Sequence, residues 1–135
     1  VDPQGGLLLA RLDALHPAGL WSGVVPGDAR PDYRLAVHWQ DGHTGVYADA
    51  YAYGTLLSDA ELQALHAGRH PHPYELLGAH PQELGGVEGV RFAVWAPNAR
   101  RVSVVGAFNS WDGRRHPMRL RHVAGVWELF VPHVR

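Results

Sequence analysis

The chain has 135 residues, no cysteine and a formal net charge of −1 with its 10 histidines counted as neutral. This length allows one domain or two small modules, and the lack of thiols excludes a disulfide framework and a thiolate metal site. The near-neutral charge argues against nucleic acid or an anionic membrane as the main partner, so we expect a neutral ligand. No glycine-rich phosphate loop follows a strand, and we expect no cofactor. The 16 glycines and 10 prolines favour short strands and turns.

The first residues do not have the pattern of a signal peptide or of a membrane span. The apolar run at residues 7–10 is too short to cross a bilayer, and the acidic Asp2 stands where a signal peptide carries positive charge. The chain begins with Val1 rather than methionine, so we expect an internal starting point. The cysteine-free composition is compatible with a reducing compartment, and we expect a cytoplasmic location.

The first half of the chain predicts short strands. Residues 11–17 could form a helical turn or an irregular connection, and residues 20–26 predict a short strand. Residues 33–39 alternate between large apolar or aromatic side chains and smaller or polar ones, as in a strand with one buried face. A tight turn at Asp41-Gly42 and a returning strand at residues 45–48 complete a predicted hairpin.

A short helix is predicted in the middle of the chain. Ser58 and Glu61 have the spacing of a capping box, and the apolar residues that follow recur at helical intervals up to the stop at Gly68. The proline-containing stretch 68–73 cannot continue a helix, so we expect a module boundary there.

Two strand-like runs and an aromatic loop follow in the second half. Residues 91–96 and 101–105 predict a hairpin-like pair closed at Pro97. The next loop contains Phe108 and Trp111 among polar residues and glycines, so we expect at least one of these rings to be exposed. An exposed indole beside amide and carboxylate groups suits a sugar ring.

These runs resemble a known family. WAPNARRVSVVGAFNSWDGRRHPM at residues 95–118, followed by GVWELFVP at residues 125–132, closely resembles the family 48 carbohydrate-binding module of bacterial 1,4-α-glucan (glycogen) branching enzymes. Residues 74–80, YELLGAH, resemble the segment that opens this module. Residues 33–57 are similar, more loosely, to the end of the extra amino-terminal module of many such enzymes.

The resemblance implies an all-β chain of immunoglobulin-like β-sandwich modules with one short helix between them. Residues 1–68 would be the closing part of the first module, and residues 69–135 the opening part of the carbohydrate-binding module. The implied function is non-catalytic: the chain would bind α-1,4-glucan or glycogen and position a downstream (β/α)₈ barrel, which forms α-1,6 branches. A module of another α-glucan-active enzyme and a purely structural β-sandwich remain as alternatives.

Three residues of the aromatic loop are candidates for carbohydrate binding. The indole of Trp111 could stack on the apolar face of a glucose unit, while Asn109 and Asp112 bond to its hydroxyls. The alternative is that Trp111 packs inward or against another domain. Residues 114–118 are expected to form a docking edge or a hydroxyl-binding rim. We expect the other tryptophans to pack in cores: Trp21, Trp39, Trp95 and Trp127.

No catalytic or metal site is predicted. Retaining enzymes on α-glucans need two carboxyl groups about 5 Å apart on a rigid scaffold. The candidate acidic residues lie in turns, a helix cap and loops and form no convincing pair: Asp41, Asp49, Glu61, Glu88 and Asp112. Four histidines match no standard zinc spacing: His66, His70, His72 and His80.

Overall fold

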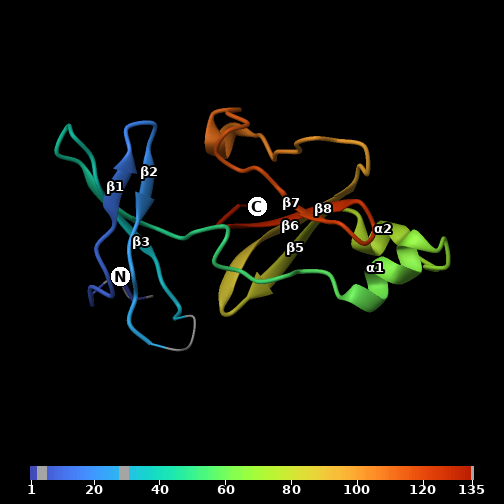
Figure 1. Ribbon diagram of the computed structural model, residues 1–135. Helices are drawn as coiled ribbons and strands as arrows, with labels where there is room; N and C mark the ends of the chain where they lie inside the picture. Colours follow the sequence, from blue (N-terminus) through green and yellow to red (C-terminus); the bar gives the residue numbers. More distant parts are fainter. Residues whose placement is uncertain (3–5, 28–30, 135) are drawn as a thin grey trace. The chain divides into compact units, whose positions relative to one another are not determined.

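The computed structural model describes residues 1–2, 6–27 and 31–134, which belong to two compact units, Val1–Ala52 and Tyr53–Arg135 (Figure 1). The regular secondary structure of both units is mainly antiparallel strand, so the predicted all-β class is confirmed. The module boundary at residues 68 and 69 stays a prediction, whereas the compact units divide sixteen residues earlier. No helix in the described ranges is long and apolar enough to cross a bilayer.

The first unit contains, within its described residues, two sheets of two strands each. Strand β1 (Asp13–His16) pairs with β2 (Leu20–Ser22), and β3 (Leu35–His38) pairs with β4 (Thr44–Tyr47). The expectation of a helical turn or an irregular connection before Pro17 was therefore wrong, because these residues form strand β1.

The predicted hairpin of the first unit is confirmed. Between β3 and β4, Trp39 N donates to His43 O over 2.8 Å and Gly42 N donates to Trp39 O over 3.0 Å, which closes a tight loop at residues 40–42. Gly42 has φ +89°, a left-handed conformation that costs glycine little. Local turn chemistry therefore fixes the register of this hairpin.

The tryptophans of the first unit do not form a core. Trp21 is 58% exposed and Trp39 is 54% exposed, so the prediction of core packing was wrong for both. Each lies in or beside a two-stranded sheet, and such a sheet has no second layer of its own to cover an indole ring.

The second unit is built on a four-stranded antiparallel sheet in the order β5-β6-β8-β7. The strands are β5 (Gly78–Leu84), β6 (Val87–Trp95), β7 (Arg119–Arg121) and β8 (Val126–Pro132). The long central strand β8 has every side chain from Val126 to Val131 buried, because both faces of the sheet are covered.

The predicted hairpin between residues 91–96 and 101–105 was wrong. Strand β6 pairs instead with β5 and with the distant β8, and Ala96 N extends the pairing with β8 by donating to Gly125 O. Pro97 has no N–H to continue the ladder, so the chain leaves the sheet there. Residues 102–104 then pair with 116–118 through the bonds Val104 N to His116 O and Met118 N to Val102 O.

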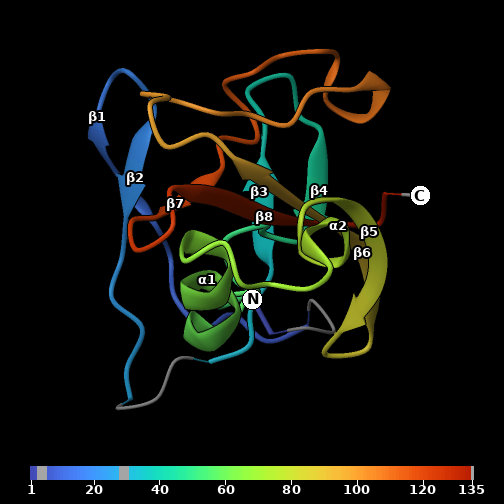
Figure 2. The same cartoon turned by 90° about the vertical axis from the view of Figure 1, so that its right-hand side faces the viewer.

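Two layers cover the sheet from opposite sides. In both views, helices α1 (Asp59–His66) and α2 (Pro73–Leu76) lie on one side, and the loops of residues 97–118 lie on the other (Figure 1 and Figure 2). The layered arrangement fits the predicted immunoglobulin-like sandwich. The buried cluster beneath the helices is Leu57, Leu62, Leu76, Ala93, Ala124 and Val126.

Helix α1 begins as the sequence predicts. Ser58 Oγ accepts from Glu61 N over 3.2 Å, and a carboxylate oxygen of Glu61 accepts from Ser58 N over 2.8 Å. Gly68, with φ +65°, follows the end of the helix. The helix packs within the second unit through the fully buried Leu62.

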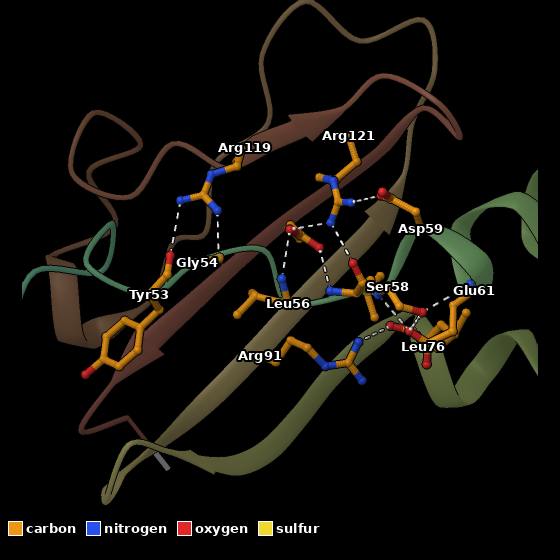
Figure 3. Close-up of polar contacts among 12 residues, drawn as sticks. Tyr53, Gly54, Leu56, Ser58, Asp59, Glu61, Leu76, Arg91, Arg119 and Arg121 are labelled. Atoms are coloured by element: carbon orange, nitrogen blue, oxygen red, sulfur yellow. Dashed lines mark hydrogen bonds and ion pairs between the residues drawn. The ribbon is translucent and has the colours of Figure 1, made fainter. Parts of the chain in front are cut away.

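A buried carboxylate ties the segment before α1 to the sheet. Glu128 accepts from Leu56 N and Leu57 N, each over 3.1 Å, and from Arg121 Nη1 over 3.0 Å. Arg121 also donates to Leu57 O and pairs with Asp59 over 2.6 Å (Figure 3). The backbone donors and the guanidinium compensate the buried charge of Glu128.

Two further arginines bind carbonyl groups of the same covering layer (Figure 3). Arg119 donates to Gly54 O over 2.8 Å, and Arg91 donates to Leu76 O over 2.7 Å. The covering layer is thus attached to the sheet by polar contacts as well as by its apolar cluster.

The two tryptophans of the sheet differ in burial. Trp127 is 8% exposed and its Nε1 donates to Ala96 O over 3.0 Å, so its predicted packing in the core is confirmed. Trp95 is 60% exposed, and the same prediction was wrong for it. It pairs with Val126 at the end of the β6–β8 ladder.

Candidate functional site

A short 3₁₀ helix, η1 (Ala107–Asn109), supports the aromatic loop. Asn109 is 1% exposed: its Oδ1 accepts from Gly106 N over 2.9 Å, and its Nδ2 donates to Val104 O over 2.8 Å. The predicted contact of Asn109 with sugar hydroxyls was therefore wrong, because the amide faces the interior. Asn109 instead holds the loop in position.

The same loop presents Trp111 to solvent. The side chain is 70% exposed, while the backbone is fixed by Trp111 N donating to Gly106 O over 2.9 Å. Ser110 and Trp111 have φ +56° and +58°. Consecutive left-handed conformations are unusual for residues other than glycine, and unusual backbone conformations concentrate at functional sites. The ring is as exposed as the sequence predicted, and its stacking on sugar stays a prediction.

Asp112 follows Trp111 in the chain, and its carboxylate is oriented by Arg114. Arg114 Nε donates to Asp112 Oδ1 over 2.9 Å, and Arg114 Nη2 donates to Asp112 Oδ2 over 2.8 Å. This pairing, the hydrogen bond from Arg114 N and the charge of Arg115 lower the pKa of Asp112. Asp112 is consequently an ionised acceptor near neutral pH, and its contact with a sugar hydroxyl remains a prediction.

His116 packs beneath the loop, a role that the sequence reasoning missed. Its ring meets that of Phe108 edge to face, with centroids 5.4 Å apart, and its Nδ1 lies 3.0 Å from Asn109 Nδ2. Burial, and secondly the charge of Arg115, lower the pKa of His116. The polar loop sequence contains no signal for this role, because the contact depends on pairing of residues 102–104 with 116–118.

An apolar groove of about 600 Å³ lies beside η1, between the loop and strands β5 and β6. Its lining includes Ala79, Phe92, Val105 and Phe108. A sugar site needs several polar groups that converge on hydroxyls, and this lining is mainly apolar. The exposed indole is therefore a better sugar platform than the groove.

The carboxyl groups with shifted pKa values do not resemble a catalytic acid. A hydrogen bond from the backbone of His43 lowers the pKa of Asp41, and one from the Ser58 side chain lowers the pKa of Glu61. A general acid near neutral pH needs a raised pKa. Within the described ranges, no three histidine, aspartate or glutamate side chains gather as metal ligands.

In a comparison with known protein families, the segment that contains this loop matches one family. Residues 76–135 match the family described as carbohydrate-binding module 48, the isoamylase N-terminal domain. The match begins at the end of α2 and includes the whole sheet, η1 and Trp111. It fits a carbohydrate-binding module of an α-glucan-active enzyme, and it does not distinguish a branching enzyme from other enzymes of that class.

Proposed function

We propose that this chain is the non-catalytic amino-terminal segment of a cytoplasmic 1,4-α-glucan branching enzyme. In this proposal it binds α-glucan and positions a downstream (β/α)₈ barrel of the same protein. One observation carries the binding role: Trp111 is exposed on a loop whose backbone is fixed from below by Asn109. This loop lies within the segment that matches the carbohydrate-binding family.

The binding mode follows from the chemistry of the loop. The flat indole of Trp111 covers the apolar C–H face of one glucose unit, and the ionised Asp112 accepts from a neighbouring hydroxyl. The fixed backbone limits the conformational entropy lost on binding. A single aromatic platform contributes on the order of 1 kcal/mol beyond area burial, by analogy with aromatic pairs, so the affinity is weak and requires a multivalent polymer.

Retardation in native gels that contain glycogen tests the binding role. Trp111→Ala should abolish retardation while circular dichroism stays that of the parent chain. The matched control is Trp95→Ala. This variant removes an indole that is also exposed, by 60%, but that lies outside the loop. Retardation that survives in folded Trp111→Ala, or that is lost equally in Trp95→Ala, contradicts the proposed site.

The parent activity requires a separate test on the full-length protein. Incubation with amylose should produce new α-1,6 linkages, as expected of a branching enzyme. Hydrolysis without new branches would place the module in another α-glucan-active enzyme. The isolated chain should form no α-1,6 linkages, because its sequence predicts no catalytic carboxyl pair.

A further inference from the structure

The segment that carries Trp111 is strongly basic. Residues 96–118 contain four arginines and one aspartate, an excess of three positive charges in a chain whose net charge is −1. Arg100 and Arg101 precede the aromatic loop, and Arg114 and Arg115 follow it. A neutral glucan gives no reason for this concentration of charge.

Three of these guanidinium groups converge on the two residues after Trp111. Arg114 pairs with Asp112, Arg115 lies 3.9 Å from the same carboxylate, and Arg101 donates to Gly113 O. Asp112 and Gly113 are the first and second residues after Trp111, and successive Cα atoms are about 3.8 Å apart. The three guanidinium groups therefore contact the chain within two residues of Trp111.

One carboxylate cannot neutralise this group of arginines. The forked contact with Arg114 compensates the charge of Asp112. The Arg115 side chain remains mostly exposed, and its closest contact with Asp112 is longer than a hydrogen bond. Arg101 is also exposed and meets a carbonyl rather than a carboxylate. The edge of the sugar platform therefore keeps uncompensated positive charge.

We propose that the Trp111 loop prefers α-glucan that carries phosphate ester groups to unmodified α-glucan, an inference that rests on the proposed function. The indole supplies the sugar platform, and Arg115 and Arg101 bind a phosphate on the same or the next glucose unit. Guanidinium groups suit this ligand because their planar N–H groups match two phosphate oxygens.

The preference should be moderate and sensitive to salt. Exposed ion pairs are weak individually, so two such contacts give about a three- to tenfold higher affinity at low ionic strength. Salt screens exposed charges over about 10 Å at 0.1 M, so the preference should decrease as salt is added. Stacking on unmodified glucan should change little under the same conditions.

The experiment compares one polymer in two states, using the whole chain. Native gels contain either phosphate-bearing amylopectin or the same amylopectin after enzymatic dephosphorylation, at several salt concentrations. The test variant is Arg115→Gln, which leaves the Asp112–Arg114 pair in place. The matched control is Arg69→Gln, which makes the same charge change at an exposed position after helix α1.

The expected result is about three- to tenfold stronger retardation by the phosphorylated polymer. Arg115→Gln should reduce this preference about two- to fourfold, and Arg69→Gln should leave it unchanged. Equal retardation by both polymers, lost in Trp111→Ala, overturns the phosphate preference and leaves the proposed function intact. No retardation by either polymer contradicts the proposed function, and the preference with it.

A final arm separates phosphoglucan binding from general attraction to polyanions. If a sugar-free polyphosphate competes as well as phosphorylated maltodextrin of equal phosphate content, the preference is overturned. The same holds if Trp111→Ala binds the phosphorylated polymer as tightly as the parent chain. The proposal requires both the indole and the arginines.

Discussion

The side-chain amide Nδ2 of Asn109 lies 3.0 Å from Nδ1 of His116, beneath the loop that holds Trp111 in solvent. An amide nitrogen is only a donor, so Nδ1 accepts and the imidazole carries its proton on Nε2. Protonation of Nδ1 would place two donors against each other. The support of the loop therefore depends on a neutral His116.

The stability of the second unit should decrease in mild acid. Burial first, and the charge of Arg115 second, lower the pKa of His116 in the folded chain. His116 therefore binds a proton more readily in the unfolded chain than in the folded one. The stability that neutral His116 contributes is fully present above about pH 6.5 and is lost as pH falls through the folded pKa. The melting midpoint should be lower at pH 5.5 than at pH 7.5, and by a smaller amount in His116→Gln.

Exposed His122 provides the control for this measurement. His122→Gln should keep the pH dependence of the parent chain. If His116→Gln and the parent lose the same amount of stability between the two pH values, the buried histidine is not responsible.

Removal of the Asn109 amide should destabilise the loop. Asn109→Ala leaves Gly106 N and Val104 O without their partner. Unsatisfied buried groups cost about 1–3 kcal/mol, which urea denaturation should detect as a lower free energy of unfolding. Retardation by glycogen should weaken as well, although the indole is intact. Asn98→Ala, at an exposed position, should change neither quantity.

The buried carboxylate of Glu128 should matter more than its exposed counterpart in the same sheet. Glu128→Ala removes the acceptor of Leu56 N and Leu57 N and one partner of Arg121. Breaking a buried pair costs about 3–5 kcal/mol, and Glu128→Gln should cost less because one acceptor oxygen remains. Urea denaturation measures both values. Glu83→Gln, on the exposed side of β5, should be nearly neutral, and an equal loss would contradict the assigned role.

Local features of this fold could be predicted from the sequence. The capping box at Ser58, the hairpin around Gly42 and the exposure of Trp111 each depend on residues within a few positions along the chain. The structure has all three, because short-range hydrogen bonds and turn conformations determine them.

Features that depend on distant partners could not be predicted. Strand β6 pairs with β8, more than thirty residues later, and nothing in residues 91–105 marks that choice over a local hairpin. Asn109 looked like a ligand contact because a polar side chain in a glycine-containing loop is usually exposed. Asn109 is buried because the segment around His116 packs against it, and no local sequence pattern indicates this contact.

The left-handed backbone at Trp111 predicts an unusual order of stability among substitutions. At φ +58°, alanine has a backbone strain of about 1–2 kcal/mol that glycine does not have. Glycine in turn lowers the free energy of unfolding by about 0.4–1 kcal/mol, because its unfolded chain has more conformational entropy. Trp111→Gly should therefore be more stable than Trp111→Ala by about 0.5–1 kcal/mol in urea denaturation. Both should lose retardation by glycogen, since both lack the ring. The reverse order, with alanine the more stable, would mean that the loop does not hold this conformation in solution. If the predicted order is found, a residue other than glycine carries a backbone cost at this position, which is expected when display of the ring rather than stability determines the residue there.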